Sequence, residues 1–193
     1  MVTAVNSNPG WNAPFRPQPA VLEETVGIPT DEFVASARPQ DLGRQQRSNW
    51  CWAACIQMVM GFHGIPSQQA AIVASTFGAP IDRPGRPLEI LANLNGLAVD
   101  ANGRPAAVST DSTHLDDATI VADLAQRRPL IVGLTGHAYV MTGAYFHRDQ
   151  FGNPVIDGVV LRDPWPDSPS RQEMSAAEFS QRLQFATRIR VDR

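Results

Sequence analysis

Residues 48–64 read SNWCWAACIQMVMGFHG, and this stretch decides the fold of the chain. Apolar side chains recur at the i, i+3, i+4 and i+7 spacing from Cys51 to Phe62, which predicts a helix. Its other faces are nearly as apolar, and a helix that is apolar all round is buried on most sides. Ser48 or Asn49 is expected to cap its start. The stretch therefore predicts a buried central helix with a cysteine in its first turn.

Cys51 is expected to be the second residue of this helix, and it stands between two tryptophans. Unpaired backbone N–H groups and the positive end of the helix dipole at such a position favour a thiolate over a thiol. The thiolate is the nucleophilic form of cysteine. Because a cysteine near a helix start is more often inert packing, the hypothesis of a nucleophile needs a base elsewhere in the chain.

The second cysteine, Cys55, follows one helical turn later. The Cβ atoms of residues four apart on a helix lie about 5–6 Å from each other, beyond the roughly 3.5–4.5 Å that a disulfide needs. A metal site built from both cysteines and His63 would lack the second ligand pair of structural zinc sites. We therefore expect no disulfide, metal or cofactor, and interpret Cys55 as a small buried side chain.

The composition is that of an ordinary globular domain. The 193 residues are 43% hydrophobic and 18% charged, and the net charge of −3 provides no basic surface for nucleic acid. No apolar run approaches the roughly 18 residues of a membrane span. The N-terminal residues lack the charged and apolar regions of a secretory signal. We expect a protein that is cytoplasmic as synthesised, with secretion by a signal-peptide-independent route as the alternative.

Helices are expected to precede strands along the chain. Further helices are predicted at about 67–77, 87–94 and 115–127, and a short one opens at Ser175. Strands are predicted at 129–134, 137–146, 154–163 and 185–191. This order indicates an α+β fold with the helices packed on one side of an antiparallel sheet.

Residues 1–40 are rich in Pro, Asn and Ala and show no convincing periodicity. They predict an extended or flexible N-terminal arm before a domain that spans residues 41–193. Only the segment PAVLEETVGIP, residues 19–29, is suited to one short strand or turn within the arm.

A general base for Cys51 is expected at His137. The other histidines, His63, His114 and His147, are most simply surface residues at a helix end, in a loop and at a hairpin tip. His137 begins a predicted strand among small residues, directly after the tripeptide LTG. An ordinary strand-end histidine is the simpler interpretation unless a partner for its ring is found.

Hairpin geometry supplies such a partner. The predicted strands 137–146 and 154–163 are joined by a turn-rich stretch centred near residue 150, so paired residues should have a constant index sum of about 300. This sum pairs His137 with Asp163. Side chains directly opposed on one face lie about 4.5–5.5 Å apart at Cβ. A slip of one residue would place the two on opposite faces, so the prediction is sensitive to register.

The three side chains together predict a nucleophile, a base and an orienting group. His137 would deprotonate Cys51 and later protonate the leaving group, while Asp163 would fix the tautomer and orientation of the ring. Acyl chemistry also needs hydrogen-bond donors where negative charge develops on the carbonyl oxygen. The backbone N–H of Cys51 is one candidate, and the side-chain amide of Gln45 or of Gln46 is the other.

The sequence resembles the papain-like cysteine proteases. The resemblance lies in the order Gln–Cys–His–Asp, with Gln45 six residues before Cys51, CWAA at the helix start, GHAYVMTG around His137 and LRDPWP around Asp163. It extends over roughly residues 40–191. The chain is most similar to a short bacterial branch with NWCWAA and DPW motifs, which includes avirulence-type effector proteases and resembles domains of bacterial toxins.

The resemblance implies an α+β, papain-like fold in which an N-terminal helical part carries the nucleophile helix and packs on a C-terminal antiparallel β-sheet. It implies Cys51 as nucleophile, His137 as base, Asp163 as orienting group and Gln45 in the oxyanion hole. A tryptophan two residues after the third catalytic residue recurs in that superfamily. Trp165 fits this position, either as a cover over the His–Asp hydrogen bond or as plain core packing.

The function that the resemblance implies is a cysteine peptidase that hydrolyses a peptide or isopeptide bond of a protein or peptide substrate. A secreted bacterial effector or toxin is the expected setting, with an inhibitor or immunity protein as a further partner. The same triad also serves peptidoglycan amidases, deamidases and acyl transferases, which differ in the shape of the groove. A catalytically inert binding module is a further alternative, although all four expected positions hold competent residues.

Overall fold

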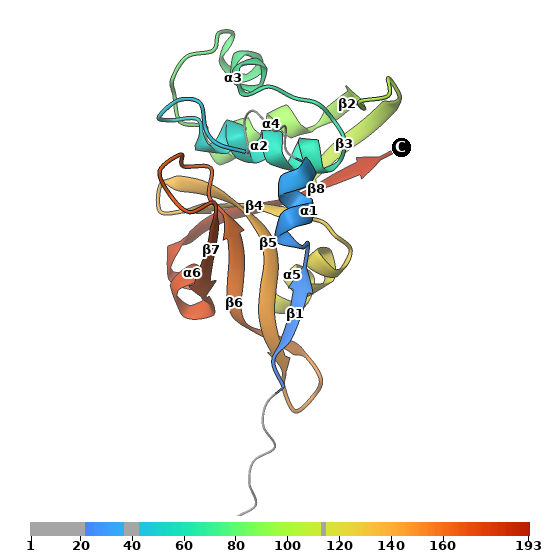
Figure 1. Ribbon diagram of the computed structural model, residues 1–193, viewed down its shortest axis with the longest axis vertical. Helices are drawn as coiled ribbons and strands as arrows, with labels where there is room; N and C mark the ends of the chain where they lie inside the picture. The colour runs from blue at the N-terminus through green and yellow to red at the C-terminus, as the bar shows by residue number, and fades with distance from the viewer. Residues whose placement is uncertain (1–21, 37–42, 113–114) are drawn as a thin grey trace, which may run out of the picture.

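The computed structural model of the protein describes residues 22–36, 43–112 and 115–193 (Figure 1). The helices in these ranges are α1 (Thr30–Ser36), α2 (Cys51–Phe62), α3 (Gln69–Phe77), α4 (Pro87–Leu94), α5 (Asp117–Ala125) and α6 (Ala176–Arg182). The strands are β1 (Glu24–Gly27), β2 (Gly96–Val99), β3 (Pro105–Asp111), β4 (Leu130–Leu134), β5 (His137–Arg148), β6 (Pro154–Arg162), β7 (Arg171–Ser175) and β8 (Leu183–Asp192).

Strand β5 organises the sheet, because three other strands hydrogen-bond to it. Neighbouring strands are antiparallel and follow the order β2-β3-β8-β4-β5-β6-β7. β4 runs beside the first part of β5 and β1 beside its later part, while β6 pairs along the opposite edge. Figure 1 shows α2, α3 and α4 gathered at one end of the molecule, with β5 and β6 running away from them.

Helix α2 is the buried central helix that its sequence predicts. Nine consecutive residues, Trp52 to Met60, are buried, and the helix packs between α1, α3, α4 and the sheet. Burial of a Val, Ile or Met side chain contributes about 1.5–3 kcal/mol. The helix begins at Cys51, one residue later than expected, and Trp50 rather than Ser48 or Asn49 occupies the cap position without a side-chain cap.

Helices cover parts of both faces of the sheet, so the expectation of helices on one side only is wrong. Helices α1 to α4 enclose one core, and α5 and α6 enclose a second core on the other face. In β4, Ile131 belongs to the first core, whereas Leu130 and Val132 belong to the second. Alternate residues of a strand point to opposite faces, so a strand buried on both sides is apolar throughout. The α+β class with an antiparallel sheet is confirmed.

The described part of the predicted arm, residues 22–36, belongs to the folded domain. The expected short strand is β1, which pairs with β5 from Glu24 to Gly27. Helix α1 was not expected; its Phe33 is 2% exposed and packs on Phe62 of α2, with ring centroids 5.4 Å apart. Residues 1–21 and 37–40 of the arm lie outside the described ranges.

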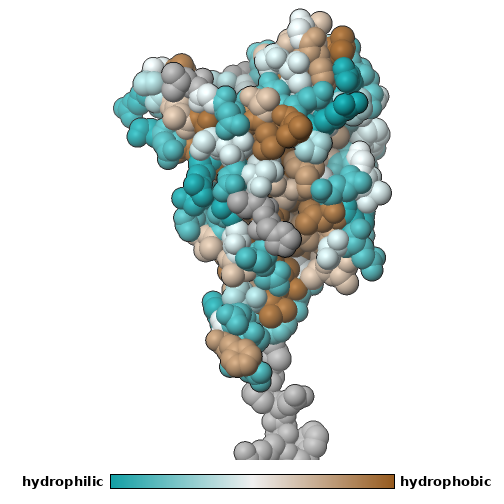
Figure 2. All heavy atoms as spheres, turned by 180° about the vertical axis from the view of Figure 1, so that it is seen from behind, coloured by the Kyte–Doolittle hydropathy of each residue, from teal (hydrophilic) through white to brown (hydrophobic). Residues whose placement is uncertain are grey.

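Large exposed apolar side chains are spread over separate segments rather than gathered on one element. Seen from behind, hydrophobic and hydrophilic groups alternate over much of the surface (Figure 2). The exposed side chains include Leu22, Ile81, Leu88, Val99 and Phe151. Single exposed apolar residues are normal on a globular surface. In the described part of the chain, no helix has the length and apolar character needed to cross a membrane.

Candidate active site

Cys51 is the first residue of α2, a free thiol that is partly exposed. The flanking tryptophans explain its fixed position. Trp50 and Trp52 are buried and donate their indole N–H groups to the carbonyl oxygens of Ile81 and Arg83, at 2.9 and 3.2 Å. These bonds hold the loop before α4 against the start of α2, so the tryptophans anchor the helix end that presents the sulfur.

His137 is the first residue of β5 and follows a tight turn. Thr135 and Gly136 have positive φ values of 43° and 83°, which reverse the chain after β4. The Nε2 atom of His137 lies 2.8 Å from Oδ1 of Asp163, and the ring also hydrogen-bonds to the sulfur of Cys51. The structure therefore brings the three side chains together from α2, from β5 and from the segment after β6.

The predicted contact between His137 and Asp163 is present, but the register used to predict it is wrong. Val140 pairs with Arg162, so the indices of paired residues add up to 302 here rather than 300, and two bulges shift the register further along the hairpin. β6 ends at Arg162, one residue before Asp163. A displacement by two residues keeps side chains on the same face. The carboxylate therefore still reaches the ring, diagonally rather than from the directly opposite position.

The electrostatics of the cluster favour a charged ring. Burial alone would lower the pKa of His137, but the hydrogen bonds and negative charges of Asp163 and Cys51 outweigh it and raise this pKa from 6.5 to about 9. Burial raises the pKa of Asp163, and the bonds from His137 and from the backbone N–H of Trp165 outweigh it and lower the pKa below its ordinary value. At neutral pH the ring is therefore an imidazolium facing an ionised carboxylate.

Asp163 has a further partner that was not predicted from the sequence. The Nε2 atom of Gln172 donates to Oδ2 of Asp163 at 2.6 Å. Gln172 lies on β7, a strand whose sequence RQEMS has one clear apolar residue, Met174, and so gives only a weak alternating signal. Pairing of β7 with β6 brings Gln172 to Asp163. This pairing could not be predicted from the residues of β7 alone.

The loop before α2 is bonded directly to the segment that carries Asp163. Arg44 donates through Nη1 to the carbonyl oxygens of Asp163 and Trp165, at 3.2 and 2.6 Å. The backbone N–H of Gln45 donates to the carbonyl oxygen of Pro164 at 2.8 Å. The carbonyl groups of three consecutive residues thus accept hydrogen bonds from two consecutive residues, and Arg44 was not among the residues predicted from the sequence.

The two glutamines that were considered for the oxyanion hole differ in burial and in hydrogen bonding. Gln45 is 5% exposed and its Nε2 donates to the carbonyl oxygens of Arg47 and Ser48, both at 2.9 Å. Its Oε1 is buried and finds no partner among the residues described. Gln46 is exposed. The amide of Gln45 therefore shapes the loop that leads into Cys51, and in this conformation its donors face loop carbonyls.

Aromatic rings surround the imidazole. Tyr139 meets the ring of His137 edge-on at a centroid distance of 4.7 Å, and Trp165 does so at 6.3 Å. Trp165 is 39% exposed, which agrees with a cover over the His137–Asp163 pair and not with plain core packing. Such a cover limits the access of water, which competes for exposed hydrogen bonds.

The other residues singled out in the sequence lie apart from this cluster. His147 bonds to Asp157 across the exposed end of the β5–β6 hairpin, and His63 ends α2. His114 lies outside the described residues. Cys55 is fully buried, and burial raises the pKa of its thiol. Within the described ranges, no group of three or more potential ligands among His, Cys, Asp and Glu is positioned to hold a metal ion.

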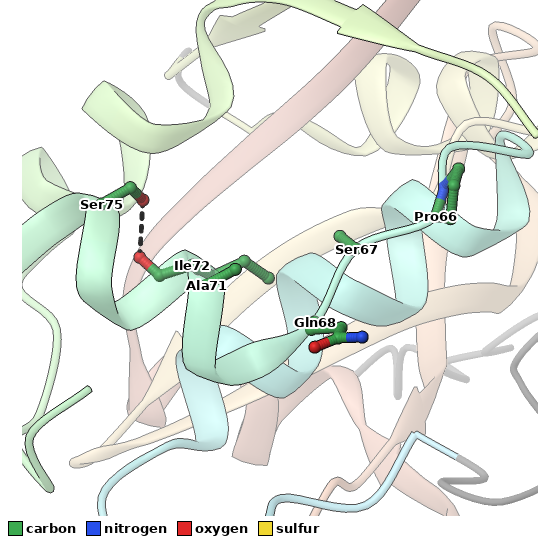
Figure 3. Close-up of a pocket in the computed structure, with 6 residues that line it drawn as sticks. All are labelled: Pro66, Ser67, Gln68, Ala71, Ile72 and Ser75. Atoms are coloured by element: carbon green, nitrogen blue, oxygen red, sulfur yellow. Dashed lines mark hydrogen bonds between the residues drawn. The ribbon is translucent and has the colours of Figure 1, made fainter. Parts of the chain in front are cut away.

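A shallow hollow of about 400 Å³ lies at the start of α3 (Figure 3). The six residues that line it are Pro66, Ser67, Gln68, Ala71, Ile72 and Ser75. Its lining has no titratable side chain, and the hydroxyl of Ser75 donates to the carbonyl oxygen of Ile72 within the helix. The hollow contains none of the four residues predicted to carry chemistry.

A sequence model of the family described as papain-like cysteine protease AvrRpt2 matches residues 35–184. The chain belongs to this family. As a papain-like cysteine protease it is a hydrolase that acts on protein substrates, which confirms the predicted resemblance and the predicted class of enzyme. A search of curated proteins finds no match.

The structure of this papain-like protease is similar to that of the peptidase domain of Streptococcus ComA, a bifunctional ABC transporter involved in a quorum-sensing pathway. The TM-score is 0.50 and the sequence identity is 16%, over 77% of this chain and 94% of that chain. At this identity the likeness shows the fold alone. It confirms the expected papain-like arrangement of helices on an antiparallel sheet.

Proposed function

We propose that this cysteine peptidase hydrolyses a peptide or isopeptide bond through an acyl-thioenzyme, with Cys51 as nucleophile, His137 as acid and base, and Asp163 as the orienting group. One observation carries the proposal. The ring of His137 hydrogen-bonds both to the sulfur of Cys51 and to the carboxylate of Asp163. A nucleophile next to a base that a third group orients is the arrangement expected for covalent catalysis of acyl transfer.

The steps follow from the charges of the cluster. The thiolate of Cys51 attacks the carbonyl carbon, and the imidazolium of His137 gives its proton to the leaving amine as the C–N bond breaks. The neutral ring then takes a proton from a water molecule, which attacks the thioester. The tetrahedral intermediate then expels the sulfur of Cys51 as a thiolate and releases the carboxylic acid, so the thiolate and the imidazolium of the starting state are both restored. Asp163 stabilises the imidazolium in each half of the cycle.

The developing oxyanion needs two donors. The backbone N–H of Cys51 is at the start of a helix that no side chain caps. The second proposed donor is the side-chain amide of Gln45, which would exchange one loop carbonyl for the substrate oxygen. Its buried position beside the loop into α2 supports this assignment over Gln46.

The first experiment compares Cys51→Ala with Cys55→Ala, because the chain provides the second cysteine one helical turn away as a matched control. Purified variants are incubated with a peptide library and with muropeptides, and products are identified by mass spectrometry. Cys51→Ala is expected to lose turnover at least about 10⁴-fold with a change in unfolding free energy below about 1 kcal/mol. Turnover by Cys51→Ala would refute the mechanism, and cleavage of muropeptides alone would favour an amidase.

For the biological setting we propose a bacterial effector or toxin that is made in the cytoplasm and exported by a signal-peptide-independent route. The support is the resemblance of the NWCWAA and DPW motifs to effector proteases. The test fractionates producing cells and the medium, with a cytoplasmic marker enzyme as control for lysis. Retention of all the protein inside intact cells would contradict this setting. A Cys51→Ala bait serves to capture an inhibitor or immunity protein, the proposed partner.

A further inference from the structure

Asp163 is held by more donors than its contact with His137 requires. Its Oδ1 accepts from Nε2 of His137 and from the backbone N–H of Trp165, both at 2.8 Å. Its Oδ2 accepts from Nε2 of Gln172 at 2.6 Å, and the hydroxyl of Ser168 also bonds to the carboxylate. Gln172 therefore holds the carboxylate oxygen that is not bonded to the imidazole.

The sheet itself fixes the position of Gln172. On β7, Gln172 and Met174 lie two residues apart and so share a face, and Met174 is buried in the second core. The residues between and before them, Glu173 and Arg171, face the other way and bond to the hydroxyl of Tyr145. Burial of Met174 sets the register of β7, and the register places the amide of Gln172 at the carboxylate after β6.

A carboxylate rotates easily about its terminal bond, because such torsions have broad minima. Rotation of the carboxylate of Asp163 would move Oδ1 away from the ring, and a donor on Oδ2 opposes that rotation. A hydrogen bond to the ionised form also favours the carboxylate over the acid. Both effects preserve the pairing of His137 with a negative charge.

We propose that Gln172 is a positioning residue of this centre, whose side-chain amide holds the carboxylate of Asp163 in the orientation that accepts the hydrogen bond of His137. The inference rests on the proposed function, since it assigns Gln172 to the same three-residue cluster. Gln172 touches neither the sulfur nor a reacting carbonyl in this assignment. It acts through Asp163 on the ring.

The test is Gln172→Leu, which keeps a similar side-chain volume and removes the donor. The readout is the titration of the His137 ring protons by NMR in the resting protein, which needs no substrate. Weaker orientation of Asp163 lowers the pKa of His137 from its value of about 9, by about one unit if one charge-assisted bond is lost. The matched control is Glu173→Leu, on the opposite face of the same strand, and it leaves the titration of His137 unchanged.

A second variant separates positioning from packing. Gln172→Glu has the same shape, and its carboxyl group stays protonated beside Asp163 because two carboxylates at this distance cannot both ionise. The acid then donates to Asp163 in place of the amide, so the pKa of His137 is retained, whereas Gln172→Leu lowers it. A side chain that only fills space would give the same result in both variants. In turnover, Gln172→Leu is expected to lose about tenfold in kcat with little change in KM.

The outcomes keep the two proposals distinguishable. An unchanged titration of His137 in folded Gln172→Leu, checked by circular dichroism, overturns the role of Gln172. The triad then still stands if Cys51→Ala loses its turnover and Asp163→Asn keeps only a small, measurable part of it. If Cys51→Ala keeps its turnover, the proposed function fails first, and the assignment of Gln172 fails with it.

Discussion

At the scale of single residues, the centre depends on the proton of His137. The pKa of this ring is raised from 6.5 to about 9 because Asp163 and Cys51 outweigh its burial. The folded protein therefore holds the proton more tightly than the unfolded chain does. The stability contributed by the charged ring is fully present below about pH 6.5 and is lost as the pH rises through about 9.

The same proton predicts the alkaline side of the pH dependence. Turnover should decline as the pH rises through about 9, because in the proposed mechanism the imidazolium gives its proton to the leaving amine. In Asp163→Asn the charged ring loses its carboxylate partner, so its pKa falls and the decline moves to lower pH. The measurement is the pH profile of kcat for a peptide that the native enzyme cleaves. The same alkaline decline in both proteins would contradict the role of Asp163.

At the scale of secondary-structure elements, β1 depends on a close backbone approach. Gly27 has a φ of +140°, and a Cβ atom there would lie 2.3 Å from the carbonyl oxygen of Thr142. Gly96 has a similar φ of +147°, but a Cβ atom there would meet nothing within 4 Å. A side chain at either glycine would therefore strain the backbone, but only a side chain at Gly27 would also clash with another strand.

Gly27→Ala is expected to destabilise the protein by about 2–4 kcal/mol, through strain together with a steric clash. Gly96→Ala is expected to cost about 1–2 kcal/mol from strain alone. Urea denaturation of both variants gives the comparison. Hydrogen exchange of the β1 amides should accelerate only in Gly27→Ala. Equal losses of unfolding free energy in both variants would show that the close approach of β1 to β5 does not contribute to the cost.

Elements with a strong local period could be predicted from the sequence, and those held by distant pairing could not. The buried run of α2 and the apolar strands β4, β5 and β6 were predicted. Strands β2, β3 and β7 were missed because each depends on a neighbour for its pairing.

The contact between His137 and Asp163 was predicted correctly despite a register error of two residues, since an even error keeps both side chains on the same face of the sheet. Arg44 and Gln172 went unrecognised, because Arg44 bonds to backbone carbonyls and Gln172 depends on the pairing of β7.

At the scale of the whole molecule, the two parts of the candidate active site are joined by the loop before α2. Arg44 reaches from this loop to the carbonyl oxygens of Asp163 and Trp165, and its own carbonyl accepts from the buried side chain of Gln69 on α3. The backbone N–H of Gln46 donates to Oε1 of Gln69, and this second bond fixes the other end of the short segment. The helical half therefore sets the position of the segment that carries the carboxylate.

Arg44→Leu should weaken this connection and lower the unfolding free energy by about 1–3 kcal/mol, since two carbonyl groups lose a charged donor. Arg47→Leu, in the same loop, is the control. Arg47 lies over the ring of Trp50 at 5.0 Å and is exposed, so its loss should cost about 0.5–1 kcal/mol. Urea midpoints at constant m-value provide the measurement. Equal losses for the two variants would mean that Arg44 does not join the halves.

The position of Cys55 beneath Cys51 determines how the enzyme responds to oxidation. Peroxide converts a reactive cysteine to a sulfenic acid, which a resolving thiolate traps as a disulfide before further, irreversible oxidation. Cys55 is enclosed in the core, and burial raises its pKa and keeps it a neutral thiol. It is therefore a poor resolving group for Cys51, the proposed nucleophile, and reduction of an oxidised Cys51 falls to a diffusible reductant such as glutathione. Under oxidising conditions, the time for which the enzyme stays active thus depends on the concentration of reductant around it.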